Sequence, residues 1–147
     1  VMNFVLEARR RRSDVVFGGD FIAGFPTEDE AAHQQSLKLI KEAEITYVHV
    51  FPYSDRENTA ASKMPKVLKK DIRYRAKELR NLAEKQHRHF LKSQIGTMQN
   101  VLVEKNSTGH SANFAKIKLQ ETIQTSEIVS TQILDVNSDH LIGTIKN

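Results

Sequence analysis

The pattern of apolar and polar positions changes character near residue 92. Before that point, short apolar runs alternate with longer segments in which apolar residues recur at helical spacing, a pattern typical of β-α-β construction around a parallel sheet. After it, short apolar runs follow one another with turn-forming residues between them. The pattern therefore predicts an α/β part in residues 1–92 and a small antiparallel all-β barrel of the OB or SH3 kind in residues 94–147.

In the first part, local signals predict the order strand, helix, strand. Residues 14–24 predict a buried strand, whose paired glycines leave room for a bend or bulge. Thr27 followed by Glu30 is a capping-box arrangement, which predicts that a helix begins there. Residues 45–51 are largely β-branched and aromatic and predict a second strand that ends at Pro52. The apolar stripe of the helix consists of Ala32, Leu37, Leu39, Ile40 and Ala43.

A long basic helix is predicted for residues 69–92, before the small strands begin. Its narrow apolar seam is formed by Ile72, Ala76, Leu79, Ala83, Gln86 and Phe90. Its other faces carry Arg73, Lys77, Arg80, Lys85 and Arg88. The strands of the second part are predicted at residues 101–103, 114–119, 128–136 and 141–145, with turns at 106–109 and 137–139.

Composition narrows the possible classes of protein. With 147 residues, of which 39% are hydrophobic and 27% charged, the chain can form one ordinary domain or two small ones, and a disordered or collagen-like chain is excluded. No apolar run approaches the roughly 20 residues that span a bilayer, and the first residues lack the order of a signal peptide, so a cytoplasmic protein without a membrane partner is expected. Cysteine is absent, which excludes disulfides, thiolate zinc sites, cysteine nucleophiles and a cysteine-ligated iron–sulfur cluster.

Positive charge is concentrated in one segment. The net charge is +4, but residues 66–92 carry 10 basic and 3 acidic groups, whereas residues 1–65 have a net charge of −2 and residues 94–147 of −1. Such a segment could attract a polyanion such as RNA, with an affinity that falls as the salt concentration rises. A well-solvated helix face is the alternative, and charge alone favours that interpretation.

The histidines and the arginine run indicate no catalytic or metal site. His87 and His89 lie two positions apart, so on a helix they point to different faces and are not expected to share a zinc ion. His49, in a predicted strand, is interpreted as a packed or hydrogen-bonded residue, because no carboxylate or nucleophile partner can be assigned to it. The run from Arg9 to Arg12 is interpreted as a solvated helix end.

Three stretches occur in an order that resembles a known family. They are GDFIAGFPTE at residues 19–28, VHVFPYS at 48–54 and NTAASKMP at 58–65. Together they resemble the radical-SAM methylthiotransferases that modify tRNA, and the second is most similar to the enzymes acting on N6-threonylcarbamoyladenosine beside the anticodon. Residues 109–114, GHSANF, resemble the strand signature of the TRAM domain, the RNA-binding barrel that ends these enzymes.

The resemblance implies that residues 1–92 are the carboxy-terminal β-α-β-α portion of a radical-SAM partial TIM barrel and that residues 94–147 are a TRAM-like RNA-binding barrel. The intact enzyme would use S-adenosylmethionine and 4Fe-4S clusters, with the cluster cysteines upstream of Val1. Neither cofactor is expected to bind this chain by itself, and the chain alone is expected to be catalytically inactive. Two other functions stay open: a stand-alone RNA-binding module, and a structural fragment that mediates association without chemistry.

The resemblance also implies which residues contact the cofactor. In α/β barrels, ligands bind at the carboxyl ends of the strands, and the side facing S-adenosylmethionine would be formed by Gly24, Phe25, Pro26, Phe51, Pro52 and Tyr53. There Phe51 or Tyr53 could pack on the adenine, while Gly24 permits close approach of the backbone. In the alternative interpretation, the glycine and prolines only shape turns and the aromatic residues fill the core.

For the expected partner, tRNA, the candidate residues lie on the long helix and on the barrel: Arg73, Lys77, Arg80, Arg88, Asn113 and Phe114. The basic side chains would hold phosphates, and Phe114 could stack on a base if it is exposed. Self-association is a further expectation, because two parallel strands by themselves leave a sheet edge and an apolar face that invite pairing with a second copy.

Overall fold

The computed structural model describes residues 1–123 and 127–146. The chain is a mixed α/β protein that divides into two compact units, Val1–His87 and Arg88–Asn147, which are described separately below. Helix α3 (Lys69–Ser93) contributes residues to both units. Within the described residues, no helix has the length and apolar character needed to cross a membrane.

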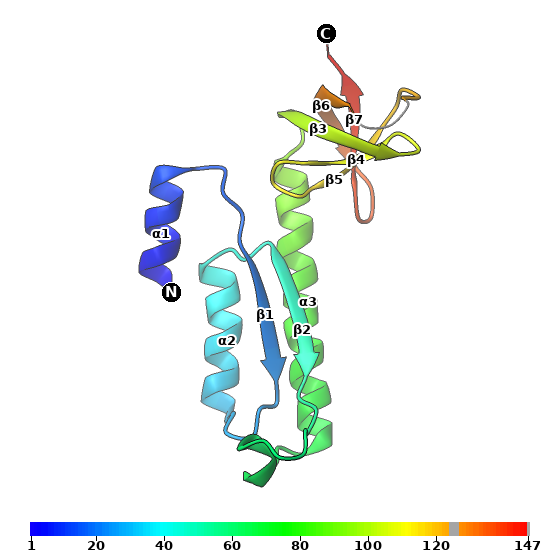
Figure 1. The fold of residues 1–147 in the computed structure, drawn as a ribbon. Coiled ribbons are helices and arrows are strands. Elements are labelled where there is room, and N and C mark those ends of the chain that lie inside the picture. Colours follow the sequence, from blue (N-terminus) through cyan, green and yellow to red (C-terminus); the bar gives the residue numbers. More distant parts are fainter. Residues whose placement is uncertain (124–126, 147) are drawn as a thin grey trace. The chain divides into compact units, whose positions relative to one another are not determined.

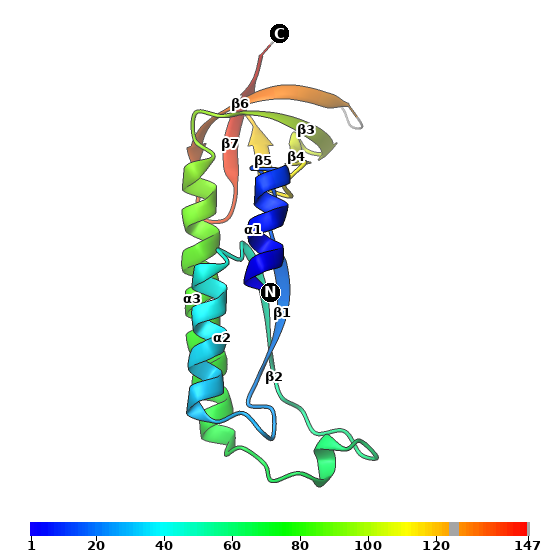
Figure 2. The ribbon, with the colours of Figure 1, turned by 90° about the vertical axis from the view of Figure 1, so that its left-hand side faces the viewer.

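The first unit is built on a β-α-β arrangement, as the sequence predicts. Strands β1 (Gly18–Ala23) and β2 (Tyr47–Pro52) are parallel, with a register that runs from Gly18 opposite Tyr47 to Ala23 opposite Pro52. The crossover between them is helix α2 (Glu30–Glu42). Figures 1 and 2 show that α2 and α3 lie side by side on one face of this two-stranded sheet. Helix α1 (Met2–Arg11) precedes β1, and a short 3-10 helix, η1 (Ala61–Lys63), follows β2.

The core of the first unit lies between the sheet and its helices. Its buried apolar residues are Val5, Ala23, Ile40, Ala43, Ile45, Ala76 and Leu79. The opposite face of the sheet is exposed, with Ile22 54% and Phe51 52% accessible. The prediction of a fully buried strand over residues 14–24 is therefore wrong, because the strand is shorter and alternates between a covered and an open face. His49 is exposed on the same face, so of the two interpretations, packed or hydrogen-bonded, packing is wrong.

Helix α2 begins two residues later than its sequence motif predicts. Asp29 is the N-cap, and its Oδ1 accepts a hydrogen bond from the amide of Ala32 at 2.8 Å. A tight turn, closed by the amide of Glu28 donating to the carbonyl of Phe25 at 2.7 Å, includes Thr27, the residue predicted to cap the helix. Aspartate caps helices at least as well as threonine. Because the turn ends at Glu28, Asp29 is the first residue after it and becomes the N-cap of α2.

The arginine run at the end of α1 is only partly solvated. Arg10 and Arg11 are exposed and pair with Glu7 of their own helix. Arg9 instead donates from Nη2 to the carbonyl of Ala43 at 2.9 Å. It also lies 5.4 Å from the ring centre of Phe17. Arg9 thus attaches the end of α1 to the end of α2.

The second unit contains a closed barrel (Figure 1). Its strands are β3 (Met98–Lys105), β4 (Thr108–Ser111), β5 (Lys116–Leu119), β6 (Ile128–Val136) and β7 (Leu141–Ile145). Among the described residues, they are arranged in the order β3-β4-β5-β7-β6. β5 and β7 run parallel and the other neighbours antiparallel, so the prediction of a purely antiparallel barrel is wrong at this pair.

The core of the second unit is formed by alternate residues of the strands, together with Leu91 of α3 and Ala115 just before β5. Its buried apolar residues are Leu91, Val101, Val103, Ala115, Ile117, Leu119, Ile133 and Leu141. β6 and β7 have the predicted bounds. The first two residues of β4, Thr108 and Gly109, were predicted as the end of a turn. The turn is confined to Asn106 and Ser107, whose φ angles of 51° and 55° reverse the chain within two residues.

Candidate functional site

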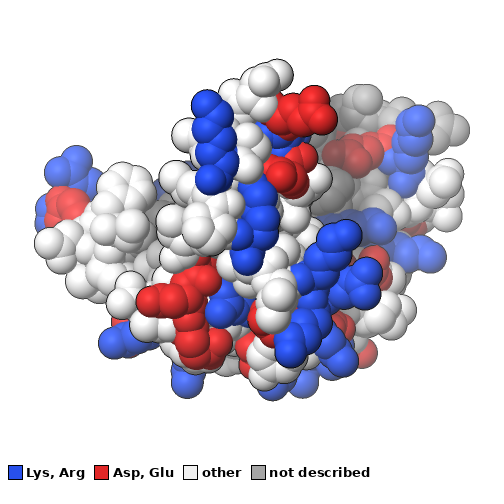
Figure 3. All heavy atoms as spheres, turned by 90° about the horizontal axis from the view of Figure 1, so that it is seen from below, with Lys and Arg blue, Asp and Glu red and all other residues white. Residues whose placement is uncertain are grey.

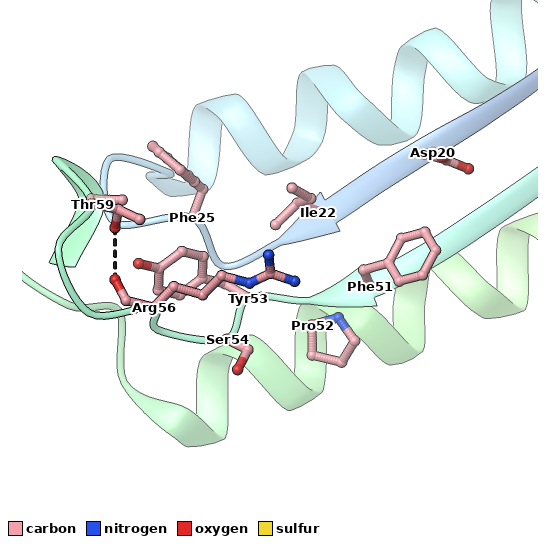
Figure 4. A pocket seen from close by; sticks show the side chains of 10 residues that line it. Asp20, Ile22, Phe25, Phe51, Pro52, Tyr53, Ser54, Arg56 and Thr59 are labelled. Carbon is pink, nitrogen blue, oxygen red and sulfur yellow. Dashed lines mark hydrogen bonds between the residues drawn. The ribbon is translucent and has the colours of Figure 1, made fainter.

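A groove of about 530 Å³ opens beside the carboxyl ends of β1 and β2 (Figure 4). It is lined by Asp20, Ile22, Phe25, Phe51, Pro52, Tyr53, Ser54, Arg56, Thr59 and Ala61. Asp20, Ile22 and Phe51 come from the open face of the sheet, and Pro52 is the last residue of β2. The other lining residues follow the strands, in the loops and, for Ala61, in η1. Four of the six residues predicted for the cofactor side, Phe25, Phe51, Pro52 and Tyr53, are brought together here.

The other two predicted residues, Gly24 and Pro26, are not part of this lining. Gly24 is buried and has a φ of 78°, and a Cβ atom at this position would lie 2.4 Å from Cγ1 of Ile72. Its amide donates a hydrogen bond to Oε2 of Glu28 at 2.6 Å. The glycine is therefore required for the packing of α3 on the turn after β1, which favours the structural alternative at this position.

The walls of the groove are apolar and aromatic. The rings of Phe25 and Tyr53 meet edge to face, with centroids 5.6 Å apart at 81°. Ile22 and Phe51 are opposite each other in the β1–β2 register and are about half exposed. Such walls suit one face of a flat, uncharged ring system.

Polar groups lie at the loop end of the groove. The hydroxyl of Tyr53 donates to Oδ1 of Asp55 at 3.1 Å, and Nζ of Lys66 donates to the same oxygen at 2.9 Å. The hydrogen bond from Lys66 lowers the pKa of Asp55, while burial and then Asp55 itself raise the pKa of Tyr53. At neutral pH, Asp55 is thus an anion and Tyr53 a neutral donor. In Figure 4 the guanidinium group of Arg56 points toward the middle of the groove.

A buried ion pair holds the loop that carries Phe25. Nη1 of Arg75, on α3, donates to the carbonyl of Glu28 at 2.8 Å and to its Oε2 at 3.0 Å. The side chains of Arg75 and Glu28 are 10% and 9% exposed. Together with the amide of Gly24, these contacts tie the turn after β1 to the long helix. No feature of the sequence separates Arg75 from the other basic residues of the helix.

The predicted tRNA-binding residues of α3 lie on the surface. Arg73, Lys77 and Arg80 are exposed in the first unit, and Nη2 of Arg80 lies 3.3 Å from the carbonyl of Val50, to which it donates. Arg88 is exposed in the second unit. Figure 3 shows basic side chains gathered in a group at the end of the first unit from which α3 starts, with acidic side chains in separate smaller groups.

The two predicted residues of the barrel occupy different environments. Phe114 is 74% exposed and adopts a φ of 61°. Asn113 is half-buried, and its amide donates from Nδ2 to Oε1 of Gln94 at 3.1 Å while its Oδ1 accepts from the hydroxyl of Ser111 at 2.5 Å. Asn113 thus holds the turn that presents Phe114.

Several lining residues escaped sequence reasoning. Asp20, Ile22 and Arg56 line the first groove, and Leu102 and Ile128 line a second one on the barrel. The signal that could have found Asp20 and Ile22 is the alternation along the strand, because residues two apart share one face of a sheet. For Arg56, which follows its strand in an irregular loop, the sequence carries no comparable signal.

The described residues contain no group of three or more histidine, cysteine, aspartate or glutamate side chains that could hold a metal ion. The chain has no cysteine, so it offers no thiolate to an iron–sulfur cluster.

The protein is thus a mixed α/β protein. It has a β-α-β unit, with a ligand-sized groove at the ends of its strands, and a separate small closed barrel. Threonylcarbamoyladenosine tRNA methylthiotransferase MtaB of Rickettsia prowazekii is 38% identical over 141 residues, which cover 96% of this chain and 34% of that protein. MtaB of Aquifex aeolicus is 34% identical over 134 residues, covering 90% of this chain and 32% of that protein. A tRNA-2-methylthio-N(6)-dimethylallyladenosine synthase of Bartonella henselae is 28% identical over 153 aligned positions. They cover 99% of this chain and 33% of that protein.

Over nearly its whole length, the chain is thus similar to proteins named as tRNA methylthiotransferases. It spans about a third of the length of the curated relatives it matches. No family model matches the chain.

Proposed function

We propose that this chain works as the carboxy-terminal part of an enzyme that methylthiolates N6-threonylcarbamoyladenosine next to the anticodon of tRNA. The observation that carries this proposal is the 38% identity, over 96% of the chain, to a protein named threonylcarbamoyladenosine tRNA methylthiotransferase. The relatives whose names specify dimethylallyladenosine are 27–29% identical to this chain and so less similar to it. The difference favours the threonylcarbamoyl substrate.

In this proposal the first groove forms one side of the S-adenosylmethionine site. Phe51 or Tyr53 packs on the adenine ring, since both line the groove and Phe51 is half exposed. S-adenosylmethionine supplies the radical and methyl-group chemistry when bound to the intact enzyme. The 4Fe-4S clusters need ligands from outside this chain, because no cysteine is present. The chain by itself is therefore inactive.

The tRNA is held by the exposed basic side chains of α3 and by the TRAM-like barrel. Arg73, Lys77 and Arg80 are accessible to phosphates in the first unit, and Arg88 in the second. The closed barrel alone also supports a second candidate, a stand-alone RNA-binding module, since its core is complete without the first unit's apolar residues.

A chimera tests the catalytic proposal. The corresponding third of the Rickettsia prowazekii relative is replaced by this chain, and tRNA nucleosides from cells lacking the endogenous enzyme are measured by mass spectrometry. We expect the 2-methylthio derivative of threonylcarbamoyladenosine, and no product from this chain alone. A chimera that folds and loads its clusters but makes no product, or modifies only dimethylallyladenosine, contradicts the proposed function. RNA binding without any product would favour the stand-alone module.

A charge reversal tests the basic helix. The double variant Arg73→Glu and Arg80→Glu should weaken tRNA binding and reduce the slope of log affinity against log salt, by about 0.9 for each phosphate that is no longer neutralised. The matched control is Arg10→Glu with Arg11→Glu on α1, which changes the net charge equally at exposed positions. Equally weakened binding in both double variants would remove this helix from the tRNA interface.

A further inference from the structure

The open face of the β1–β2 sheet carries two different rows of side chains. Near the carboxyl ends of the strands, Ile22 and Phe51 lie opposite each other and form walls of the first groove. Two residues earlier on each strand, Asp20 lies opposite His49. Residues two apart in a strand share one face and are separated by about 7 Å. The open face therefore passes from an apolar row near the strand ends to a polar row beside it.

Both side chains of the polar row are available to a ligand. Asp20 and His49 are exposed, and within residues 1–123 and 127–146 neither side chain has a hydrogen-bond or ion-pair partner. Asp20 also lines the first groove, and Figure 4 places it beyond Ile22, on the side away from the loop end. On the other face of the same strands, Phe21 and Val50 pack against the core. The fold thus requires the residues of the covered face and makes no use of the polar pair.

The two groups of the pair complement each other as hydrogen-bonding partners. The carboxylate of Asp20 only accepts hydrogen bonds, whereas the imidazole of His49 has an N–H to donate in either protonation state. Together they suit a ligand group that has a donor beside a negatively charged acceptor. A hydrocarbon group offers neither, and it would remove water from the carboxylate and the imidazole without replacing their hydrogen bonds. The pair therefore favours a polar substituent and disfavours an apolar one.

The proposed substrate carries such a group on its adenine. The threonylcarbamoyl group is a threonine joined to N6 through a urea linkage, so it has a hydroxyl donor and a carboxylate acceptor. The dimethylallyl group on the same nitrogen is a hydrocarbon. In the proposed function the first groove faces S-adenosylmethionine, and the adenosine that is modified lies close to that cofactor. The polar row adjoins the groove on the same face, where the substituent of this adenosine is expected.

We propose that Asp20 and His49 select the substrate by its threonylcarbamoyl group. An N–H of His49 donates to the threonyl carboxylate, and the carboxylate of Asp20 accepts from the threonyl hydroxyl. Both are substrate-binding residues, and no bond forms or breaks at either one. The inference rests on the proposed function for the identity of the substrate, and it adds the residues that separate this substrate from dimethylallyladenosine. A site built to hydrogen-bond a substrate rejects an analogue that lacks the bonding groups.

The test measures binding of the full chain to four fluorescein-labelled anticodon stem-loop RNAs by fluorescence anisotropy. They differ only at the modified adenosine, which carries the threonylcarbamoyl group, its neutral carboxamide, its deoxy analogue with α-aminobutyrate in place of threonine, or the dimethylallyl group. Their phosphates are identical, so the basic side chains bind all four alike. The wild type should bind the threonylcarbamoyl RNA about tenfold more tightly than each of the others, as the loss of a hydrogen bond to a charged group predicts.

Each variant should remove one preference and keep the other. His49→Ala should bind the threonylcarbamoyl RNA and its carboxamide equally, while still preferring the hydroxyl over the deoxy analogue. Asp20→Ala should lose the preference for the hydroxyl and keep the preference for the carboxylate. A loss of structure, or self-association through this face, weakens all four RNAs alike and changes neither preference. The matched controls are His89→Ala and Asp135→Ala, exposed residues of the second unit, which should keep both preferences.

Equal binding of all four RNAs by the wild type overturns the inference. That result is expected if the pair instead holds the ammonium and carboxylate groups of S-adenosylmethionine. The inference is also overturned if either variant of the pair keeps both preferences. Failure of the chain to bind any of the stem-loops would overturn this inference and the proposed tRNA partner together. The nucleoside product of the chimera judges the catalytic proposal separately.

Discussion

Gly24 shows how a residue with the sequence signature of a ligand contact can instead be a packing requirement. Its positive φ of 78° and the 2.4 Å distance from its ideal Cβ to Cγ1 of Ile72 exclude a side chain on two independent grounds. The first is backbone strain and the second is a direct clash with α3. The two effects can be separated, because Gly96 has a similar φ of 83° with no atom within 4 Å.

Gly24→Ala should therefore destabilise the first unit by more than the ~1–2 kcal/mol that a left-handed conformation costs an L-residue. Gly96→Ala should be destabilised by only that amount, since only its backbone is strained. Urea unfolding followed by circular dichroism measures both. The clash predicts in addition that Gly24→Ala costs less when Ile72 is already alanine. Equal destabilisation at the two glycines would contradict the packing role of Gly24.

Tyr47 gives a prediction for alkaline pH. Burial raises the pKa of Tyr47 from 10.0 to about 12. The folded state thus favours the neutral phenol, and the resulting stability is fully present below pH 10 and is lost as the pH rises through about 12. In Tyr47→Phe there is no phenol to ionise, so the decline in the free energy of unfolding over this range should be smaller. Chemical unfolding at a series of alkaline pH values measures the two slopes, and parallel slopes would refute the effect.

At the scale of elements, α3 is attached to the first unit through polar as well as apolar contacts. The Arg75–Glu28 pair links it to the turn after β1. One turn further along, Oε2 of Glu78 lies 2.9 Å from Nε2 of His33, a fully buried residue of α2. The helix thus fixes both the loop that shapes the first groove and the helix that crosses between its strands.

Arg75→Met should be strongly destabilising, because it leaves the carboxylate of Glu28 buried without its cation, a change that typically costs about 3–5 kcal/mol. Adding Glu28→Gln removes the orphaned charge and should restore part of the stability. The exposed pair Arg12–Asp14, with side chains 60% and 67% accessible, is the control, and Arg12→Ala should cost less than about 1 kcal/mol. Urea unfolding measures all variants. Destabilisation in Arg75→Met no larger than in Arg12→Ala would show that the buried pair does not hold the turn.

The elements that periodicity defines were predictable, and those that tertiary contacts define were not. The seam of α3 and the alternation in β6 and β7 come from local spacing, so the elements formed where expected. The start of α2 depends on a turn that competes with the capping motif, and β4 depends on a two-residue reversal at Asn106 and Ser107. The parallel pairing of β5 with β7 follows from barrel closure, which no local pattern reports.

The candidate site was predictable to the same extent. The aromatic residues after each strand were found because the motif places them at strand ends, where ligands bind. The lining residues Asp20 and Ile22 need the strand to have one open face, whereas the sequence predicted a buried strand. The grouping of Leu102, Ile128 and Phe114 needs the register of three separate segments. Burial and register are properties of the whole unit, so a single segment cannot report them.

At the scale of the whole molecule, the first unit exposes a sheet that a complete α/β protein would cover. Among the described residues, β1 and β2 pair only with each other, so each has an unpaired edge. Their open face carries Ile22 and Phe51 opposite each other, and Asp20 and His49 form another pair two positions along. Exposed strand edges and apolar faces favour pairing with another chain.

We therefore expect this chain to self-associate through the open face of β1 and β2. Ile22→Glu and Phe51→Glu place charges on that face and should shift the protein toward monomer, because burying an unpaired carboxylate in an interface is costly. Leu68→Glu, which changes a residue 61% exposed elsewhere in the first unit, is the control and should associate like the wild type. Sedimentation velocity over a dilution series measures the monomer fraction. A wild-type chain that stays monomeric at every concentration would refute the expectation, and an equal shift toward monomer in Leu68→Glu would place the interface away from the sheet.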